Sequence, residues 1–325
     1  MNNMKKHRYL AAACLLLLSL LAVSCISDDY PVRDKATVKM TFTTRAISNP
    51  TTTAGGLEAN EHMSTLRVIV ARQNGEILYN LKYDIAENET SKTITFSEMT
   101  VNADGETFDF YAIANEAGVE YSKSWENVTV ADLKGMNLSE GFLTNANDVS
   151  KNTMIPQTAY KQIRVAPQSG GGIQSETMKL DFAVAKVRLT INNTSSAVQT
   201  VSNINLSGLN MTSTPLFTSG TLSGETEGTL SLGNMTIDDN STATVYAYFF
   251  ENTGGDYALT ADWNNNTQTL DINAANITEI SRGTELNINI KLNATIPSSP
   301  EFYIEVVPWA EVEVDVPPFE VPQFK

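Results

Sequence analysis

Apolar and polar residues alternate with a period of two through most of the chain after Thr65. Successive side chains of a strand point to opposite faces, so this period is typical of half-buried β-strands. The apolar positions of these runs include Leu66, Val68, Val70, Ile77, Tyr79, Leu81, Tyr83, Ile94, Phe96, Phe108, Phe110, Ala112, Val245, Ala247, Phe249, Tyr257, Leu259, Ala261, Trp263, Leu270, Ile272, Leu286, Ile288, Ile290 and Leu292. In the first half, a short helix is predicted only near Val130 to Leu138.

Asn74-Gly75 separates two of these alternating runs. Asn-Gly between apolar alternations is typical of a β-hairpin whose type I′ turn needs positive φ at both central residues. We therefore predict a hairpin centred on this pair.

A Gly-rich break at 168–172 divides the strand pattern. We place a domain boundary there, because Gln, Ser and three glycines cannot pack a core. Beyond the break the apolar parity changes near Ala185, which predicts one long strand with a bulge. The short strands and scarce helix predict an all-β protein with two β-sandwich domains in tandem, 46–172 and 173–300.

The first 24 residues have the composition of a secretory signal. A positive start is followed by an apolar run, Tyr9–Val23, that is short for a membrane span. Leu21-Ala22-Val23-Ser24-Cys25 then resembles a bacterial lipobox, in which the signal is cut before a lipidated cysteine. Cys25 would be the only cysteine left after cutting, which favours lipidation over the alternative of an ordinary signal followed by an incidental cysteine.

The chain is acidic, with Lys+Arg 22 against Asp+Glu 37 and a net charge of -15. Removing 1–24 takes away three basic residues and no acidic one, so the balance becomes 19 minus 37, or -18. Such a surface repels phosphate backbones and anionic lipids. We therefore expect no nucleic-acid partner, and membrane contact only through the lipid on Cys25.

Residues for catalysis or metal binding are scarce. The chain has two histidines and two cysteines, and only His62 and Cys25 lie outside the signal. The carboxylates at Asp238-Asp239 and within 102–106 have the composition of turns, and 170–172 lacks the Gly-Lys-Ser/Thr of a phosphate loop. We expect His62 to be an exposed loop residue, and we assign no catalytic residue, metal or cofactor.

The N-terminal region holds one isolated strand pattern, with Val38, Met40 and Phe42 on its apolar side. Arg45 follows it, and 48–56 then has the Ser, Thr, Pro and Gly composition of a mobile loop that proteases cut easily. The C-terminal region holds two further alternating runs, reached through a hinge between Pro297 and Pro300. Their apolar residues are Phe302, Ile304, Val306, Val312, Val314 and Val316. This tail could pack on its own domain or on that of a neighbour.

Together these features resemble the FimA-type major fimbrillins, the type V pilins of the Mfa-like fimbrial subunit family. The resemblance covers nearly the whole chain, and it depends on the order of several segments. They are the lipobox at Cys25, Thr44-Arg45-Ala46, Tyr111-Ala112-Ile113-Ala114-Asn115, Ile155-Pro156, Phe182-Ala183-Val184-Ala185-Lys186-Val187 and Val306-Val307-Pro308-Trp309.

The resemblance implies two transthyretin-like β-sandwiches and a precursor held at the outer membrane as a lipoprotein. An arginine-specific protease would cut after Arg45, remove 25–45 with its strand, and leave Ala46 as the mature N-terminus. The groove left by that strand would be filled by the tail 301–325 of another copy or of a related subunit. The implied product is a cell-surface fimbrium that supports adhesion.

Two alternatives stay open. The chain could be a fimbrial tip or anchor subunit, although a usable cut site and a free tail favour the stalk. It could instead be a monomeric surface lipoprotein that binds glycan or host protein, with Trp263 and Trp309 as sugar platforms. Both tryptophans lie in strand patterns, which favours core positions for them.

Overall fold

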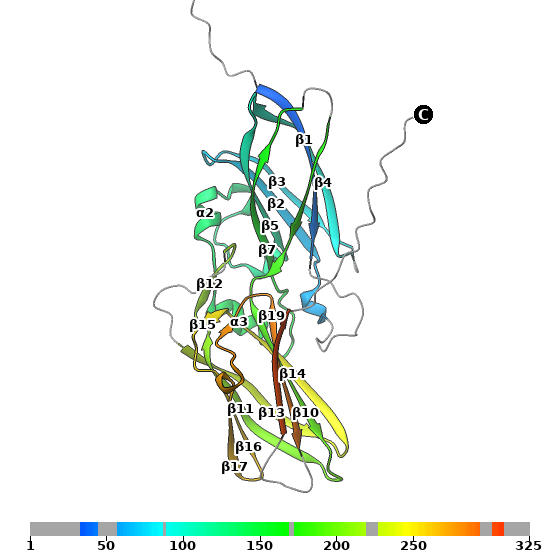
Figure 1. The fold of residues 1–325 in the computed structure, drawn as a ribbon, viewed down its shortest axis with the longest axis vertical. Helices are drawn as coiled ribbons and strands as arrows, with labels where there is room; N and C mark the ends of the chain where they lie inside the picture. The colour runs from blue at the N-terminus through cyan, green and yellow to red at the C-terminus, as the bar shows by residue number, and fades with distance from the viewer. Residues whose placement is uncertain are drawn as a thin grey trace, which may run out of the picture. The chain divides into compact units, whose positions relative to one another are not determined.

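A computed structural model describes residues 33–44, 57–86, 89–168, 172–218, 227–292 and 301–308 (Figure 1). These residues are mostly in antiparallel β-sheets, which confirms the predicted all-β class and agrees with tandem β-sandwiches. The chain forms two compact units. The smaller comprises the described parts of Met1–Val38, Phe96–Glu106 and Arg164–Gln174, and the larger comprises those of Lys39–Thr95, Thr107–Ile163 and Ser175–Lys325.

The first half of the chain contributes two sheets. A five-stranded sheet has the order β3-β2-β5-β7-β9, and a three-stranded sheet has the order β4-β1-β8. The strand bounds are β1 (Arg33–Thr43), β2 (Thr65–Arg72), β3 (Ile77–Asp84), β4 (Ser91–Asn102), β5 (Glu106–Ala114), β7 (Gln157–Val165), β8 (Gln174–Lys179) and β9 (Asp181–Phe182). The short elements are η1 (Ala59–Glu61), η2 (Glu116–Gly118), η3 (Trp125–Asn127), α2 (Val130–Gly135), β6 (Asn137–Ser139) and α3 (Glu140–Ala146).

The second half contributes two four-stranded sheets, with the orders β14-β10-β19-β20 and β13-β11-β16-β17. The bounds are β10 (Ala185–Asn193), β11 (Gln199–Asn210), β12 (Ser213–Pro215), β13 (Glu227–Ile237), β14 (Ser241–Phe249), β15 (Asn252–Thr253), β16 (Ala258–Trp263), β17 (Asn266–Asp271), η4 (Asn273–Ala275), β18 (Glu279–Ile280), β19 (Thr284–Leu292) and β20 (Glu301–Pro308). Two-stranded pairs, β12 with β6 and β15 with β18, complete the pairing.

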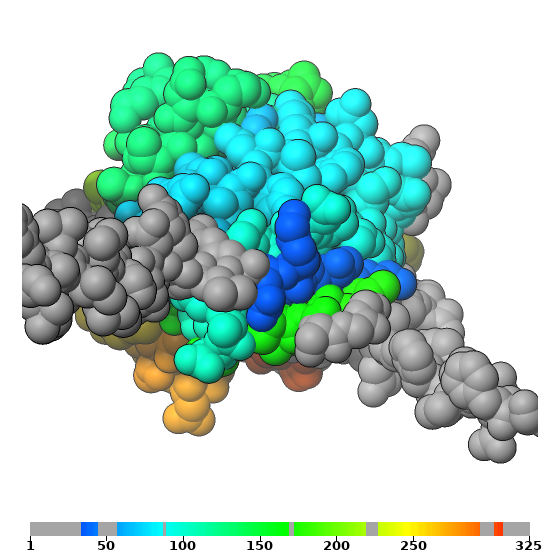
Figure 2. Space-filling view, turned by 90° about the horizontal axis from the view of Figure 1, so that it is seen from above, coloured from blue at the N-terminus to red at the C-terminus, as the bar shows by residue number. Residues whose placement is uncertain are grey.

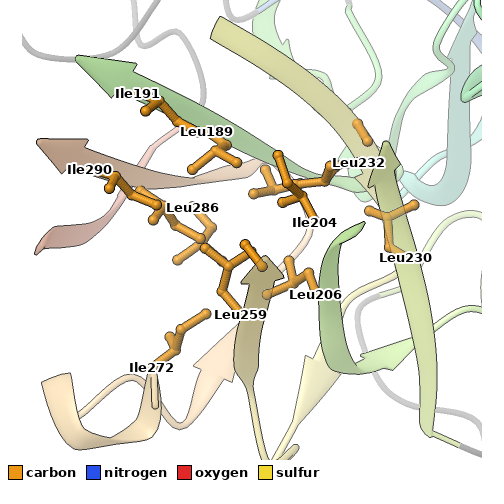
Figure 3. Close-up of a cluster of buried hydrophobic side chains, with 14 of the residues drawn as sticks. Leu189, Ile191, Ile204, Leu206, Leu230, Leu232, Leu259, Ile272, Leu286 and Ile290 are labelled. Atoms are coloured by element: carbon orange, nitrogen blue, oxygen red, sulfur yellow. The ribbon is translucent and has the colours of Figure 1, made fainter. Parts of the chain in front are cut away.

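Side chains from both four-stranded sheets form one buried core (Figure 3). Leu189 and Ile191 enter it from β10, while Leu206 of β11 and Leu259 of β16 enter it from the facing sheet. The inward residues alternate with mostly half-buried ones along β16 and the second part of β10, as the period-two pattern predicts. This core holds β19 and β10 as parallel neighbours, and β20 then pairs antiparallel with β19.

The predicted hairpin is confirmed, but the predicted type I′ turn is wrong. Strands β2 and β3 pair antiparallel, and Gly75 has φ of +90°. Asn74 is not among the described residues with positive φ, so the turn is not type I′. The Gly75 amide donates to the Arg72 carbonyl at 2.9 Å, and the register shifts at Ala71, as in a type I turn followed by a glycine bulge.

The predicted long strand with a bulge near Ala185 is also wrong. The chain ends β9 at Phe182, passes through Ala183-Val184, and begins β10 at Ala185. Strand β9 pairs with β7, whereas β10 pairs with β14 and β19. The change of parity therefore marks a change of sheet. Strand β8 lies after the Gly-rich break and still pairs with β1, so the change of partners falls at 183–184.

The helix predicted near Val130 is present as α2. Thr129 caps it, because its hydroxyl accepts from the Asp132 amide at 3.1 Å while the Asp132 carboxylate accepts from the Thr129 amide at 3.0 Å. The neighbouring α3 was not predicted. Within the described ranges, every helix is too short or too polar to cross a membrane.

Candidate assembly site

Strand β1 occupies the middle of the sheet β4-β1-β8. Val38, Met40 and Phe42 are each 0% exposed, and Ala36, which shares their parity, is also buried. The intervening residues are exposed or half-buried. Figure 2 shows the blue N-terminal strand at the surface between cyan and green segments. The three predicted residues therefore share one buried face, and Ala36 is a fourth member of it that was not predicted.

Backbone hydrogen bonds hold the end of β1 on both sides. The Thr44 amide donates to the Thr90 carbonyl at 2.9 Å, next to the N-terminal end of β4. The Leu180 amide donates to the Thr43 carbonyl at 2.8 Å, directly after β8. Because β1 is a central strand, its loss would leave two strand edges with unpaired backbone groups.

Removal of β1 would also expose an apolar groove. Fully burying a side chain of the size of Val, Met or Phe contributes about 1.5–3 kcal/mol, so Val38, Met40 and Phe42 together give a gross term of roughly 5–9 kcal/mol. The outward face contributes less. The exposed ion pair of Lys35 with Glu98, at 3.2 Å, is of the kind worth about 0–1 kcal/mol.

Strand β20 pairs with β19 of its own chain, from Glu301 opposite Lys291 to Pro308 opposite Thr284. Ile304 and Val306 are partly buried against the core of the second half, whereas Phe302 is 38% exposed. As the structure has them, these residues form an edge strand of their own sheet. The structure thus brings the first part of the predicted tail onto its own domain.

The other predicted site residues lie outside the described residues. They are Cys25, Arg45, Ala46, Val312, Val314 and Val316.

A pocket of about 370 Å³ opens where β1 ends. It is lined by Thr44 and by the first described residue after the predicted cut site, Leu57. Apolar side chains complete much of the wall, namely Met63, Ile85 and Met154. No sequence signal pointed to this pocket, because its walls come from segments far apart in the chain.

A buried charged cluster lies near η1, soon after the predicted cut site. Lys186 Nζ is 2.7 Å from Glu61 Oε1 and 3.5 Å from Glu285 Oε2. Arg188 contacts Glu285 and Glu58, both at 3.0 Å. Burial and the neighbouring Glu61 raise the pKa of Tyr248, whose hydroxyl donates to that carboxylate at 2.8 Å. These charges are paired with one another, and the cluster fixes η1 against β10 and β19.

Other candidates for chemistry have structural positions. His62 is exposed, as predicted, and Trp263 is a core residue with 5% exposure, which removes it as a sugar platform. The carboxylates near Asp104 and Asp239 lie in turns. Within the part of the chain that the structure describes, no group of three or more His, Cys, Asp or Glu could hold a metal ion.

No protein-family model matches the sequence, and no curated protein matches it. Solved structures do match. The tip fimbrial protein Mfa3 from Porphyromonas gingivalis, with C-terminal truncation, has a TM-score of 0.55 at 13% identity, covering 85% of this chain and 100% of that one. The fimbrilin FimA from P. gingivalis W83 has a TM-score of 0.54 at 9% identity, with coverages of 85% and 98%.

The chain has the fold of fimbrial subunits. A putative cell adhesion protein from Parabacteroides distasonis is similar as well, with a TM-score of 0.54, 14% identity, and coverage of 87% of this chain and 99% of that one. At the level of the fold, these similarities confirm the resemblance seen in the sequence.

Proposed function

We propose that this chain is a structural subunit of a cell-surface fimbria and that it polymerises by strand exchange. The observation that carries the proposal is the position of β1, a central strand with a fully buried face that lies directly before the predicted cut site. A sheet that loses such a strand is a template for strand addition. The shared fold with fimbrial proteins supports the same function.

The precursor is exported and tethered to the outer membrane by a lipid on Cys25. Ser27-Asp28-Asp29 follows it, as in lipoproteins that are sent to the outer face of the outer membrane. An arginine-specific protease then cuts after Arg45. The cut releases β1 together with the lipid, so one event both frees the subunit and opens its groove.

We propose a donor segment shorter than the tail 301–325 that the sequence predicts. Strand β20 remains part of its own domain, because Ile304 and Val306 pack against the core of that domain and β20 pairs along its length with β19. The donor segment therefore begins after Pro308 and comprises 309–325. Its apolar residues include Val312, Val314 and Val316.

The partners are other copies of the chain or related fimbrial subunits, and the fibre supports adhesion and colonisation. Similarity to a tip protein and to a fimbrilin is nearly equal, with TM-scores of 0.55 and 0.54. The choice of a stalk position therefore depends on the predicted cut site at Arg45 and on the proposed donor segment 309–325.

The N-terminal residue of fimbrial material sheared from cells tests this function. We expect Ala46. In the variant Arg45→Ala we expect lipidated, unpolymerised precursor to accumulate, whereas the matched variant Arg33→Ala, upstream in the same removed segment, should assemble normally. If Arg45→Ala forms fibres at the normal rate, either the protease cuts at another residue or polymerisation does not require the cut.

A further inference from the structure

The donor segment matches β1 in the spacing of its apolar residues and in the position of its alanine. The buried positions of β1 are Ala36, Val38, Met40 and Phe42. At the same spacing, the tail has Ala310, Val312, Val314 and Val316. If the donor runs in the same direction as β1, Ala310 takes the site of Ala36. The three valines of the donor then take the sites of the three larger buried residues of β1.

The opposite direction fits poorly. It would place Val316 at the site of Ala36, which is 2% exposed, and Ala310 at the site of Phe42, which is 0% exposed. The first exchange overpacks the groove, and the second leaves a cavity that a phenyl ring had filled.

The prolines of the tail favour the same direction. With Ala310 at the site of Ala36, Pro317 and Pro318 fall at Thr43 and Thr44, where β1 ends. Proline cannot donate a ladder hydrogen bond, so Pro318 gives up the bond that the Thr44 amide donates to the Thr90 carbonyl, but this loss falls at the very end of the strand. In the reversed direction the same prolines would fall at Lys35 and Asp34, inside the strand.

This register leaves seven residues, Phe319–Lys325, beyond the end of the groove. They begin directly after the site of Thr44, a residue that lines the pocket in the uncut chain and leaves with the cut segment. Three of the seven, Phe319, Val321 and Phe324, are apolar.

We propose that the pocket lined by Leu57, Met63, Ile85 and Met154 binds the segment Phe319–Lys325 of a second copy of this chain. This inference rests on the proposed function, because the pocket receives the segment only after the donor has replaced β1. Apolar side chains form part of the wall, as they form part of the segment, beside polar ones such as Glu89 and Thr90. In the uncut chain, where Thr44 also lines it, the pocket has a volume of about 370 Å³, within the range of pockets that hold small ligands, about 300–1,000 Å³. Binding in the pocket slows the dissociation of the donor from the groove.

Two truncations separate this inference from the proposed function. A chain stopped after Pro308 loses the whole donor and should form no fibres. A chain stopped after Pro318 keeps the groove-filling residues and should form fibres whose subunits dissociate about tenfold faster than those of the full chain. Equal dissociation rates for the Pro318 stop and the full chain would overturn the role of the pocket while leaving strand exchange intact.

A second variant fills the pocket without removing any part of the tail. Ala59 lines the pocket and is exposed, so Ala59→Trp should occupy the space without disturbing the core. We expect the same faster dissociation as for the Pro318 stop. Normal dissociation for this variant would count against the pocket.

Cysteine cross-linking tests the contact itself. The mature chain 46–325 contains no cysteine, so an introduced pair is the only pair. Fibres carrying Met154→Cys and Phe319→Cys should give disulfide-linked multimers on denaturing gels after oxidation and heating. Val149 is 98% exposed and does not line the pocket, so Val149→Cys with Phe319→Cys is the control. Equal yields from the two pairs, or none from the pocket pair, would overturn the inference, and failure of the full cleaved chain to form fibres would overturn the proposed function with it.

Discussion

Lys186 Nζ lies 2.7 Å from Glu61 Oε1, and both side chains are fully buried. Glu61 ends η1, and Lys186 is the second residue of β10. The contact is reinforced at Glu61 by the Tyr248 hydroxyl and at Lys186 by Glu285. Residues soon after the predicted cut are thus fixed to the body, so removal of β1 need not disturb them.

Lys186→Met should destabilise the protein by about 3–5 kcal/mol, because it leaves the carboxylate of Glu61 buried without its cation. Denaturant unfolding of the full chain measures this. The matched control is Lys161→Met, since Lys161 is 43% exposed and its contact with Glu176, at 2.9 Å, is that of a surface pair. That variant should lose less than about 1 kcal/mol. Similar losses for the two variants would contradict the importance of burial.

Stability should depend on pH through Glu116. Burial raises the pKa of this carboxyl, but hydrogen bonds from Arg67 and Lys82 outweigh it and hold the pKa below its ordinary value. A lowered folded-state pKa adds stability above the unfolded pKa, about 4.3, and the gain is lost as pH falls through the folded pKa.

Glu116→Gln should therefore cost about 1–3 kcal/mol at pH 7, by weakening hydrogen bonds to charged groups. Its deficit relative to the natural chain should shrink as unfolding is measured at successively lower pH below about 4. Glu98→Gln is the control, because Glu98 is 78% exposed in its pair with Lys35. A deficit at Glu116→Gln that is independent of pH would mean that the charge of Glu116 is not what stabilises the fold.

Two C-terminal truncations should differ in stability. A chain stopped after Pro308 keeps β20 and should melt as cooperatively as the full chain. A chain stopped after Ser299 loses β20 with Ile304 and Val306, two partly buried side chains, and should be less stable by roughly 2–4 kcal/mol. Thermal unfolding followed by circular dichroism measures both. If the two truncated chains melt at the same temperature, β20 does not stabilise its own domain, and the donor would be the longer segment 301–325.

Cys25→Ala should abolish fatty-acid labelling of the precursor. Cys25 is the only cysteine outside the predicted signal, so no other thiol can take the lipid after the signal is cut. Metabolic labelling with a clickable fatty acid measures this, and Cys14→Ala, inside the signal, should keep its label. Equal label on Cys25→Ala and on the natural chain would refute lipidation at this residue.

The strands of this protein were predictable because their signal is local. Alternate side chains of one strand face alternate environments, so Leu286, Ile288 and Ile290 predict β19 without knowledge of its neighbours. The buried face of Val38, Met40 and Phe42 was predictable for the same reason. The turn residues near Gly105 likewise act within a few residues of chain.

The partner of each strand was not predictable in this way, because pairing joins residues that are far apart in the chain. The alternation of Ile304 and Val306 is the same whether β20 pairs with β19 or with another copy, and only the fold shows the pairing with β19. Near Ala185 the pattern showed that parity changes, while the fold shows that the chain changes sheets there.

The cluster around Lys186 and the pocket at the end of β1 depend wholly on tertiary structure. Glu61, Lys186 and Glu285 have no common local pattern, and packing in three dimensions brings their charges together away from water. Leu57, Ile85 and Met154 likewise form one wall only because the strands around them are packed. Local alternation thus specifies which face of a strand is buried, whereas long-range packing energy selects what that face is buried against.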